Sequence, residues 1–204
     1  MLQSVLQLSR DSWGLIPILV LVFIIGLSVI VERFFFFRRS ISAGTTLEYD
    51  LQAVEPGDGE RAGTVVRHYA GSVQGEMVKS ALTARGRDEP SFERALEETL
   101  MFQLPKLDRN LWVLDTCVTL GPLMGLLGTI IHMIEAFNAL AATGGQNAQS
   151  VTGPISHALV ATAAGLCIAI VCVVFLNYFN KRIRVLVNQM DLIKSMLVSR
   201  FSAA

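Results

Sequence analysis

Three stretches of the chain are apolar over lengths that can cross a lipid bilayer as a helix. Crossing the hydrocarbon core takes roughly 20 predominantly apolar residues, and residues 13–37, 113–142 and 154–180 all reach that length. Residues 38–112, between the first two stretches, are charged and mixed in sign, whereas residues 143–153, between the last two, carry no charge. The pattern predicts an all-α membrane protein with three transmembrane helices.

The first apolar stretch has to be distinguished from a cleaved signal peptide. Its core, residues 14–31, carries no charge, is too long for a signal peptide and is not followed by an A-x-A-like cleavage site. Instead, Glu32 and Arg33 follow, then four phenylalanines, then Arg38 and Arg39. Because aromatic residues are enriched at membrane interfaces, we expect this stretch to be a transmembrane helix.

Positive charges predict the direction of the three helices, because cytoplasmic loops carry an excess of Lys and Arg. Before the first stretch stands Arg10 alone, whereas basic residues cluster after the first and third stretches. These clusters consist of Arg33, Arg38, Arg39, Lys181, Arg182 and Arg184. We therefore expect residues 1–12 and 143–153 outside, and residues 38–112 and 181–204 inside.

The long polar region is expected to be helical with one break. The segment "EPGDGERAG" (residues 55–63) predicts a turn-rich break. The segment "RDEPSFERALEETLMFQL" (residues 87–104) predicts a helix, with acidic residues in its first turn and Pro90 near its start. We expect this helix to continue past Pro105 into the second apolar stretch, so that the membrane helix projects beyond the bilayer.

The C-terminal region is expected to be a helix with an apolar seam. Its apolar residues recur at gaps of three, four, three and four, which is the a/d spacing of a helix that packs on a partner helix. These residues are Ile183, Leu186, Met190, Ile193 and Leu197. The spacing fits a partner helix of the same chain and one of another subunit alike.

Composition narrows the class of protein further. The chain is 52% hydrophobic and 17% charged, whereas about one quarter of the residues of a soluble domain are charged. Its formal net charge is zero, so no excess of positive charge indicates binding to nucleic acid. Cys117, Cys167 and Cys172 all lie in apolar stretches, so we expect small buried side chains rather than a disulfide framework. The chain carries no P-loop, HExxH, CxxC, GxSxG or dinucleotide motif. We expect neither an enzyme nor a metal or cofactor site.

Polar residues inside the second and third apolar stretches are the candidate functional residues. Thr129, His132 and Glu135 are three positions apart and share one helix face, and the third stretch holds His157 and Thr162. Ionisable groups in a membrane helix are costly and usually face a protein interior or a water-filled path. These five residues are therefore candidates for a pore lining or proton pathway.

Structural roles are the alternative for the same residues. A threonine in a membrane helix often bonds its own backbone, and His132 can be a packed or interhelical bonding group. Glu135 can be protonated, paired with a histidine, or near the interface. Counting the rise per residue from the outer ends, we expect the two threonines within one to two turns of each other near mid-membrane.

Small residues form a second pattern in these two stretches. Such residues allow helix backbones to approach closely. They are Gly121, Gly125 and Gly128 in the second stretch, and Ala161, Gly165 and Ala169 in the third. The pattern predicts helix packing within a bundle or an oligomer.

The same residues carry a resemblance to a known family. "LDTCVTLGPLMGLLGTIIHMIEAFNAL" (residues 114–140) resembles the signature "PLLGLLGTVxGMIxAF" of the MotA/TolQ/ExbB proton channel family. "PISHALVATAAGLCIAIVCVVFLNYFNKRI" (residues 154–183) resembles the family's "PGIAEALxATAxGLxAAIPAVxxYN", and "VERFFFFRR" (residues 31–39) resembles its Glu-Arg step. The motifs stand in the family's order.

The resemblance implies a function that the residues alone do not. Family members are bacterial inner-membrane homo-oligomers, pentamers where known, whose second and third spans surround a central pore. The pore holds the helix of a one-span partner of the ExbD/TolR type, which supplies an essential aspartate that faces the positions of Thr129 and Thr162. Proton flow drives a TonB-like or TolA-like protein. The N-terminus would be periplasmic and the C-terminus cytoplasmic.

The chain departs from the family signature at three positions. The family usually has glutamate at the position of His157, glycine at that of His132 and a neutral residue at that of Glu135. We hypothesise that Glu135, with His157 or His132, replaces the missing glutamate. An ExbB-type energiser of TonB-dependent import is the leading interpretation, followed by a TolQ-type subunit; a MotA-type stator has four spans. A nonconducting scaffold, a membrane enzyme and sodium as the coupling ion remain alternatives.

Overall fold

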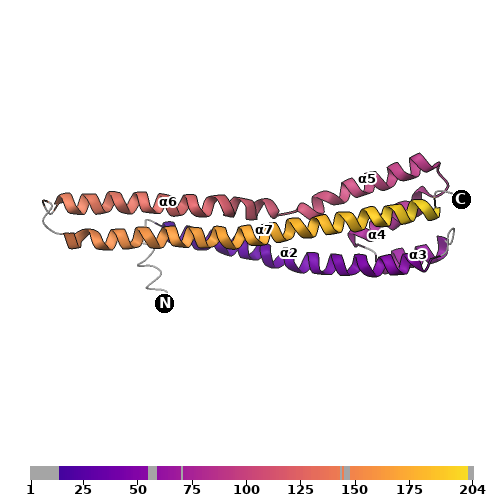
Figure 1. Ribbon diagram of the computed structural model, residues 1–204, viewed down its shortest axis with the longest axis horizontal. Coiled ribbons are helices and arrows are strands. Elements are labelled where there is room, and N and C mark those ends of the chain that lie inside the picture. The colour runs from indigo at the N-terminus through magenta and orange to yellow at the C-terminus, as the bar shows by residue number, and fades with distance from the viewer. Residues whose placement is uncertain (1–13, 55–58, 70, 143, 145–147, 202–204) are drawn as a thin grey trace. The chain divides into compact units, whose positions relative to one another are not determined.

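The computed structural model describes residues 14–54, 59–69, 71–142, 144 and 148–201, and these residues form helices and turns with no strand. The helices are α2 (Leu15–Gln52), α3 (Gly59–His68), α4 (Val73–Ala84), α5 (Glu89–Asp108), α6 (Leu111–Ala142), the 3-10 helix η1 (Ala148–Val151) and α7 (Thr152–Phe201) (Figure 1). By length and composition, three helical segments can cross a membrane: Leu15–Gln52, Glu89–Ala142, which joins α5 and α6, and Gln149–Phe201. The predicted all-α fold with three apolar helices is confirmed.

The chain divides into two compact units, and α2 and α7 contribute residues to both. The first unit, the apolar unit, consists of Met1–Val31 and Asn110–Asn177. The second, the polar unit, consists of Glu32–Arg109 and Tyr178–Ala204. Neither long helix ends where its apolar stretch ends: α2 continues to Gln52 and α7 to Phe201. Pro154 lies in the first turn of α7, where its missing N–H is tolerated.

The predicted continuity between the polar region and the second apolar stretch is wrong. Helix α5 passes through Pro105, as expected, but ends at Asp108, and α6 begins at Leu111. Asn110 between them has a φ of 63°, a left-handed conformation that stops a right-handed helix and that asparagine adopts more readily than most residues. The two helices are therefore separate elements.

Predictions for the rest of the polar region are mixed. Residues 55–58 of the expected turn-rich break lie outside the described residues, but the remainder of that segment, from Gly59, is the start of helix α3, so the prediction is wrong there. The predicted start of α5 is confirmed, with Pro90 in its first turn. Asp88 caps this helix by accepting a hydrogen bond from the Ser91 N–H at 3.4 Å. The hydrogen bond from Ser91 lowers the pKa of the Asp88 carboxyl.

The apolar seam at the C-terminal end of α7 packs on its own chain. Four of its five residues, Leu186, Met190, Ile193 and Leu197, are almost completely buried within the single chain. Other large buried side chains of the polar unit come from α2, α4, α5 and α7 itself, and they include Phe37, Leu47, Leu51, Met77, Phe92, Leu96, Leu107, Phe179 and Phe201. Since burying such a side chain is worth about 1.5–3 kcal/mol, the seam accounts for a large part of this unit's core.

Two arginines satisfy helix ends in the polar unit. The last carbonyl groups of a helix lack intrahelical partners and carry partial negative charge. Arg33 is buried and its Nη1 donates to the Lys106 carbonyl oxygen, in the last turn of α5, at 3.2 Å. Arg200 donates from Nη1 to the Leu51 and Val54 carbonyl oxygens at the end of α2. Each arginine thereby ties its own helix to the end of another.

Lys194 and Tyr69 make further polar contacts within this unit. The Nζ atom of Lys194 in α7 lies 3.0 Å from Oε1 of Glu93 and 3.1 Å from Oε1 of Glu97, both in α5. The hydrogen bond to Glu93 raises the pKa of the Lys194 ammonium group. The Tyr69 hydroxyl donates to Asp50 of α2 at 2.7 Å. Burial, with this hydrogen bond, raises the pKa of Tyr69 to about 12. These contacts orient the helices around the apolar core.

Replacing Arg200 should destabilise the polar unit measurably. In Arg200→Met the apolar stem is kept, but the carbonyl groups at the end of α2 lose a charged donor, so we expect the free energy of unfolding to fall by about 1–3 kcal/mol. Denaturant unfolding of the full chain, followed by circular dichroism, measures this. Ser199→Ala is the control, since the exposed Ser199 hydroxyl bonds only its own helix, at Met196. Equal unfolding midpoints for Arg200→Met and Ser199→Ala would contradict the capping role.

Candidate functional site

Helices α6 and α7 run antiparallel and side by side in the apolar unit (Figure 1), with small residues at their contact. A methyl group built on Gly121 would lie 2.7 Å from the Gly165 carbonyl oxygen, and one on Gly165 would overlap the Gly121 carbonyl oxygen. The backbones therefore touch at this point. Gly125 and Gly128 continue the contact toward Thr162 and Ala161.

The structure places all six small residues of the predicted packing pattern at this contact or beside it. A methyl group on Gly125 would lie 3.0 Å from the Cα of Thr162, and one on Gly128 would lie 2.8 Å from the Cβ of Ala161. Ala169 is buried, and its N atom lies 3.4 Å from a methyl group built on Gly121. The close approach brings the polar groups of α7 within reach of the α6 backbone.

The two candidate threonines make different hydrogen bonds. The Thr162 hydroxyl of α7 donates to the Gly125 carbonyl oxygen of α6 at 3.1 Å. The Thr129 hydroxyl donates to the Leu126 carbonyl oxygen of its own helix at 2.6 Å. Gly125 precedes Thr129 by four residues, or about 6 Å of helix. Both side chains are half-buried in the single chain, at nearly one level of the α6–α7 pair.

A second polar group, the His132–Glu135–His157 cluster, lies in the same unit. His132 is completely buried, and its Nδ1 lies 3.0 Å from Glu135 Oε2, one turn along α6. The His157 ring of α7 lies 6.0 Å from the His132 ring, centroid to centroid. Among the described residues, the Nε2 atom of His132 has no hydrogen-bond partner. A carboxylate paired with one imidazole, which has a second imidazole nearby, can accept and pass on a proton.

Helix α2 packs against both helices of this pair. A methyl group on Gly26 would lie 3.2 Å from the Cys172 sulfur and 3.5 Å from the Cys117 sulfur. Both cysteines are buried, as predicted, but Cys167 is exposed, so the prediction is wrong for it. Cys167 and Cys172 are five positions apart, which turns a helix by about 500° and places the two on different faces. All three are free thiols.

The outer face of α6 is apolar and exposed in the single chain. Its exposed apolar residues include Leu123, Leu126, Leu127, Ile130, Ile134 and Phe137. An apolar face of this extent requires lipid or other helices to cover it. The faces beside Thr129 and Thr162 are thus suited to a bilayer or to an oligomer.

Sequence reasoning missed the structural role of the buried arginine. It treats Arg33 as a positive charge flanking the first apolar stretch, whereas the structure buries the side chain and directs it to the end of α5. The pairing of Arg33 with the segment before Asn110 depends on residues 73 positions apart. The position of Glu32 and Arg33 directly after an apolar stretch was the only feature of the sequence that pointed to a special role for this arginine.

A sequence model of the MotA/TolQ/ExbB proton channel family matches residues 70–192, which include every candidate site residue. The chain belongs to the MotA/TolQ/ExbB family. This is a family of channel and transport proteins, not of enzymes. Together with the three apolar helices, membership indicates a multi-pass membrane protein.

Relatives that carry ExbB names cover different shares of the chain. Putative biopolymer transport protein ExbB-like 3 of Synechocystis is 31% identical over 159 residues, 77% of this chain and 76% of the relative. A putative ExbB homolog of Methanothermobacter thermautotrophicus is 25% identical over 197 residues, 95% of this chain and 69% of the relative. Biopolymer transport protein ExbB of Xanthomonas campestris is 36% identical over 89 residues, 44% of this chain and 35% of the relative. Similarity to the MotA/TolQ/ExbB family thus extends beyond the two signature segments.

Proposed function

We propose that this chain is the proton-channel subunit of an inner-membrane complex that couples the proton-motive force to TonB-dependent import across the outer membrane. The observation that carries the proposal is the position of Thr162. Its hydroxyl reaches the α6 backbone at Gly125, one turn from Thr129. Two hydroxyl groups from antiparallel helices therefore lie at nearly the same position along the helix pair. The chain that carries them belongs to a family of proton channels.

The chemistry of the two hydroxyls fits a shuttling carboxyl group. A threonine hydroxyl can donate to a carboxylate and can accept from the protonated acid. A buried aspartate alternates between these forms when its site supplies hydrogen bonds to one and apolar walls to the other. The exposed leucine and isoleucine side chains of α6 supply such walls. Each proton that crosses 100 mV releases about 2.3 kcal/mol for work.

The proposal includes an assembly around this site. The chain forms a homo-oligomer, a pentamer by resemblance, whose α6 and α7 helices line a pore. The pore holds the single helix of an ExbD/TolR-like partner with a membrane aspartate, and a TonB-like protein receives the work. Residues 143–153 face the periplasm, and residues 38–112 and 181–204 face the cytoplasm. The apolar faces that the single chain leaves exposed support burial in such an assembly.

Reconstitution tests the proposal directly. The full chain and its ExbD-like partner, inserted together in liposomes that hold a pH-sensitive dye, should acidify or alkalise the interior when a potassium potential is applied. Replacement of the partner's membrane aspartate by asparagine should stop the flux. No flux with the unaltered partner would favour a nonconducting scaffold. Deletion of the gene, scored for siderophore import against detergent sensitivity, distinguishes a TonB-type from a TolQ-type role.

Within this proposal, the His132–Glu135–His157 cluster replaces the glutamate that the family carries in its third span. We expect Glu135→Gln and His157→Ala each to lower energised uptake several-fold, because each removes a proton-accepting group beside the buried His132. The measurement is import by cells that depend on this chain. Ser156→Ala, an exposed neighbour of His157, is the control. Wild-type uptake in both variants would show that the cluster does not replace that glutamate.

A further inference from the structure

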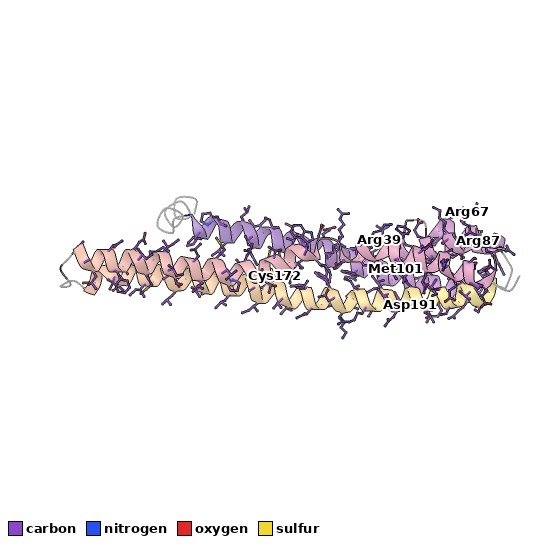
Figure 2. The ribbon with its side chains drawn as sticks, turned by 90° about the horizontal axis from the view of Figure 1, so that it is seen from above. Arg39, Arg67, Arg87, Met101, Cys172 and Asp191 are labelled. Carbon is purple, nitrogen blue, oxygen red and sulfur yellow. The ribbon has the colours of Figure 1, made fainter. Side chains whose placement is uncertain are left out.

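A hollow of about 390 Å³ opens between α2 and α7 in the polar unit. The helix α2 contributes Phe34, Arg38, Ile41 and Ser42, and α7 contributes Tyr178 and Arg182. We name it the Arg38–Arg182 hollow; Arg39, the neighbour of Arg38 in α2, is labelled in Figure 2. Along each chain segment the hollow follows directly after a long apolar stretch.

The hollow holds two positive charges without a counter-charge in its lining. Arg38 is exposed and Arg182 is half-buried. In the part of the chain that the structure describes, neither guanidinium group has a hydrogen bond or an ion pair with a protein group. None of the six lining residues is acidic. A ligand that supplies an anion would therefore find charge-assisted hydrogen bonds ready to form.

Aromatic rings hold one of the two arginines in place. The guanidinium carbon of Arg182 lies 4.8 Å from the centre of the Tyr178 ring, which is cation–π distance. Tyr178 in turn stacks on Phe34, with ring centres 6.4 Å apart and planes at 24°. Tyrosine is enriched where a membrane helix leaves the hydrocarbon. The lining therefore combines aromatic rings with two basic side chains, directly after the apolar stretches of α2 and α7.

We propose that the Arg38–Arg182 hollow binds the phosphate of an anionic phospholipid headgroup. Guanidinium groups match the planar geometry of two phosphate oxygens, and the Ser42 hydroxyl stands among the lining groups. Clusters of basic residues on the cytoplasmic side of membrane helices recognise anionic lipids. A lipid can also contact the lining rings of Phe34 and Tyr178 with its glycerol and first methylene groups, which a free phosphate ion cannot do.

Native mass spectrometry of the full chain in non-ionic detergent tests this. Palmitoyl-oleoyl-phosphatidylglycerol should bind at least fivefold more tightly than palmitoyl-oleoyl-phosphatidylcholine. Arg38→Gln and Arg182→Gln should each weaken phosphatidylglycerol binding about fivefold, which corresponds to about 1 kcal/mol per basic residue near a membrane surface. Arg184→Gln is the matched control, because Arg184 is an exposed arginine of α7 that does not line the hollow.

Three results would overturn the proposal. Equal affinity for the two lipids would show that only the acyl chains are recognised. Inorganic phosphate that competes at the same concentration as phosphatidylglycerol would assign the hollow to a free anion. Loss of oligomer mass in Arg38→Gln and Arg182→Gln, with lipid binding unchanged, would assign it to an acidic segment of a second copy. Circular dichroism identical to wild type confirms that each variant is folded before its affinity is interpreted.

Discussion

Replacing Gly165 by leucine is expected to leave almost no folded protein. A methyl group at this position already overlaps the Gly121 carbonyl oxygen. That oxygen belongs to the backbone of α6, so it cannot rotate away as the end of a flexible side chain could. The two helices would have to separate, and association of membrane helices depends on this close packing because lipid offers no hydrophobic drive.

Smaller substitutions make the effect measurable. Gly165→Ala and Gly121→Ala should each lower the free energy of unfolding by about 1–3 kcal/mol, as overpacked sites do. The full chain and each variant are heated in detergent, and size-exclusion chromatography measures the fraction that stays folded at each temperature. The midpoints rank the variants by stability. Gly153→Ala serves as the control, since nothing lies within 4 Å of a methyl group there. Equal unfolding temperatures for Gly165→Ala and Gly153→Ala would show that α6 and α7 do not make the backbone contact described above.

The helix contact was accessible to sequence reasoning because its signal is local. Glycine at 121, 125 and 128 recurs on one face of a single helix, and that spacing is readable without knowledge of the partner. The apolar seam of α7 was equally readable, but its partner was not. Whether Leu186 and Met190 pack on their own chain depends on where α2, α4 and α5 lie, and the structure shows them buried within one chain.

The errors arise where one residue or a distant contact decides the outcome. The segment before α6 consists of helix-compatible residues, so its pattern predicts continuity; the left-handed Asn110 interrupts it. Cys167 was expected in the interior because its neighbours are apolar, yet apolarity in a membrane helix does not distinguish a protein-facing from a lipid-facing side. Arg200 meets the end of α2 across a separation of 146 to 149 residues, which no local pattern indicates.

In the candidate site, too, the sequence predicts what depends on local spacing but not what depends on contacts between helices. The spacing of Thr129, His132 and Glu135 places them on one face, and the structure pairs the last two at 3.0 Å. The hydrogen bond from Thr162 to Gly125 depends on how far α7 slides along α6. A glycine at position 125 removes the side chain that would otherwise keep the threonine away. The packing pattern and the candidate proton pathway are thus two aspects of one contact.

Thr162→Val is expected to lower proton flux through the reconstituted complex about tenfold to a hundredfold. Valine keeps the shape of threonine but removes the hydroxyl group. A hydrogen bond to a charged group is worth about 1.5–3 kcal/mol, and each 1.36 kcal/mol on a barrier changes a rate tenfold. If the hydroxyl stabilises a partner carboxylate during proton transfer, the flux falls by this amount.

The same substitution should lower stability only modestly, and this separates a role in proton transfer from a role in packing. Its hydroxyl donates to the Gly125 carbonyl, a backbone oxygen inside α6 that also has an intrahelical donor, so the folded state loses about 0.5–1.5 kcal/mol. Thr162→Ser should restore most of the flux because it restores the donor. Thr119→Val is the matched control: its hydroxyl bonds only the carbonyls of its own helix, at Asp115 and Thr116. Wild-type flux in Thr162→Val would reduce Thr162 to a packing residue and remove the observation that carries the proposed function.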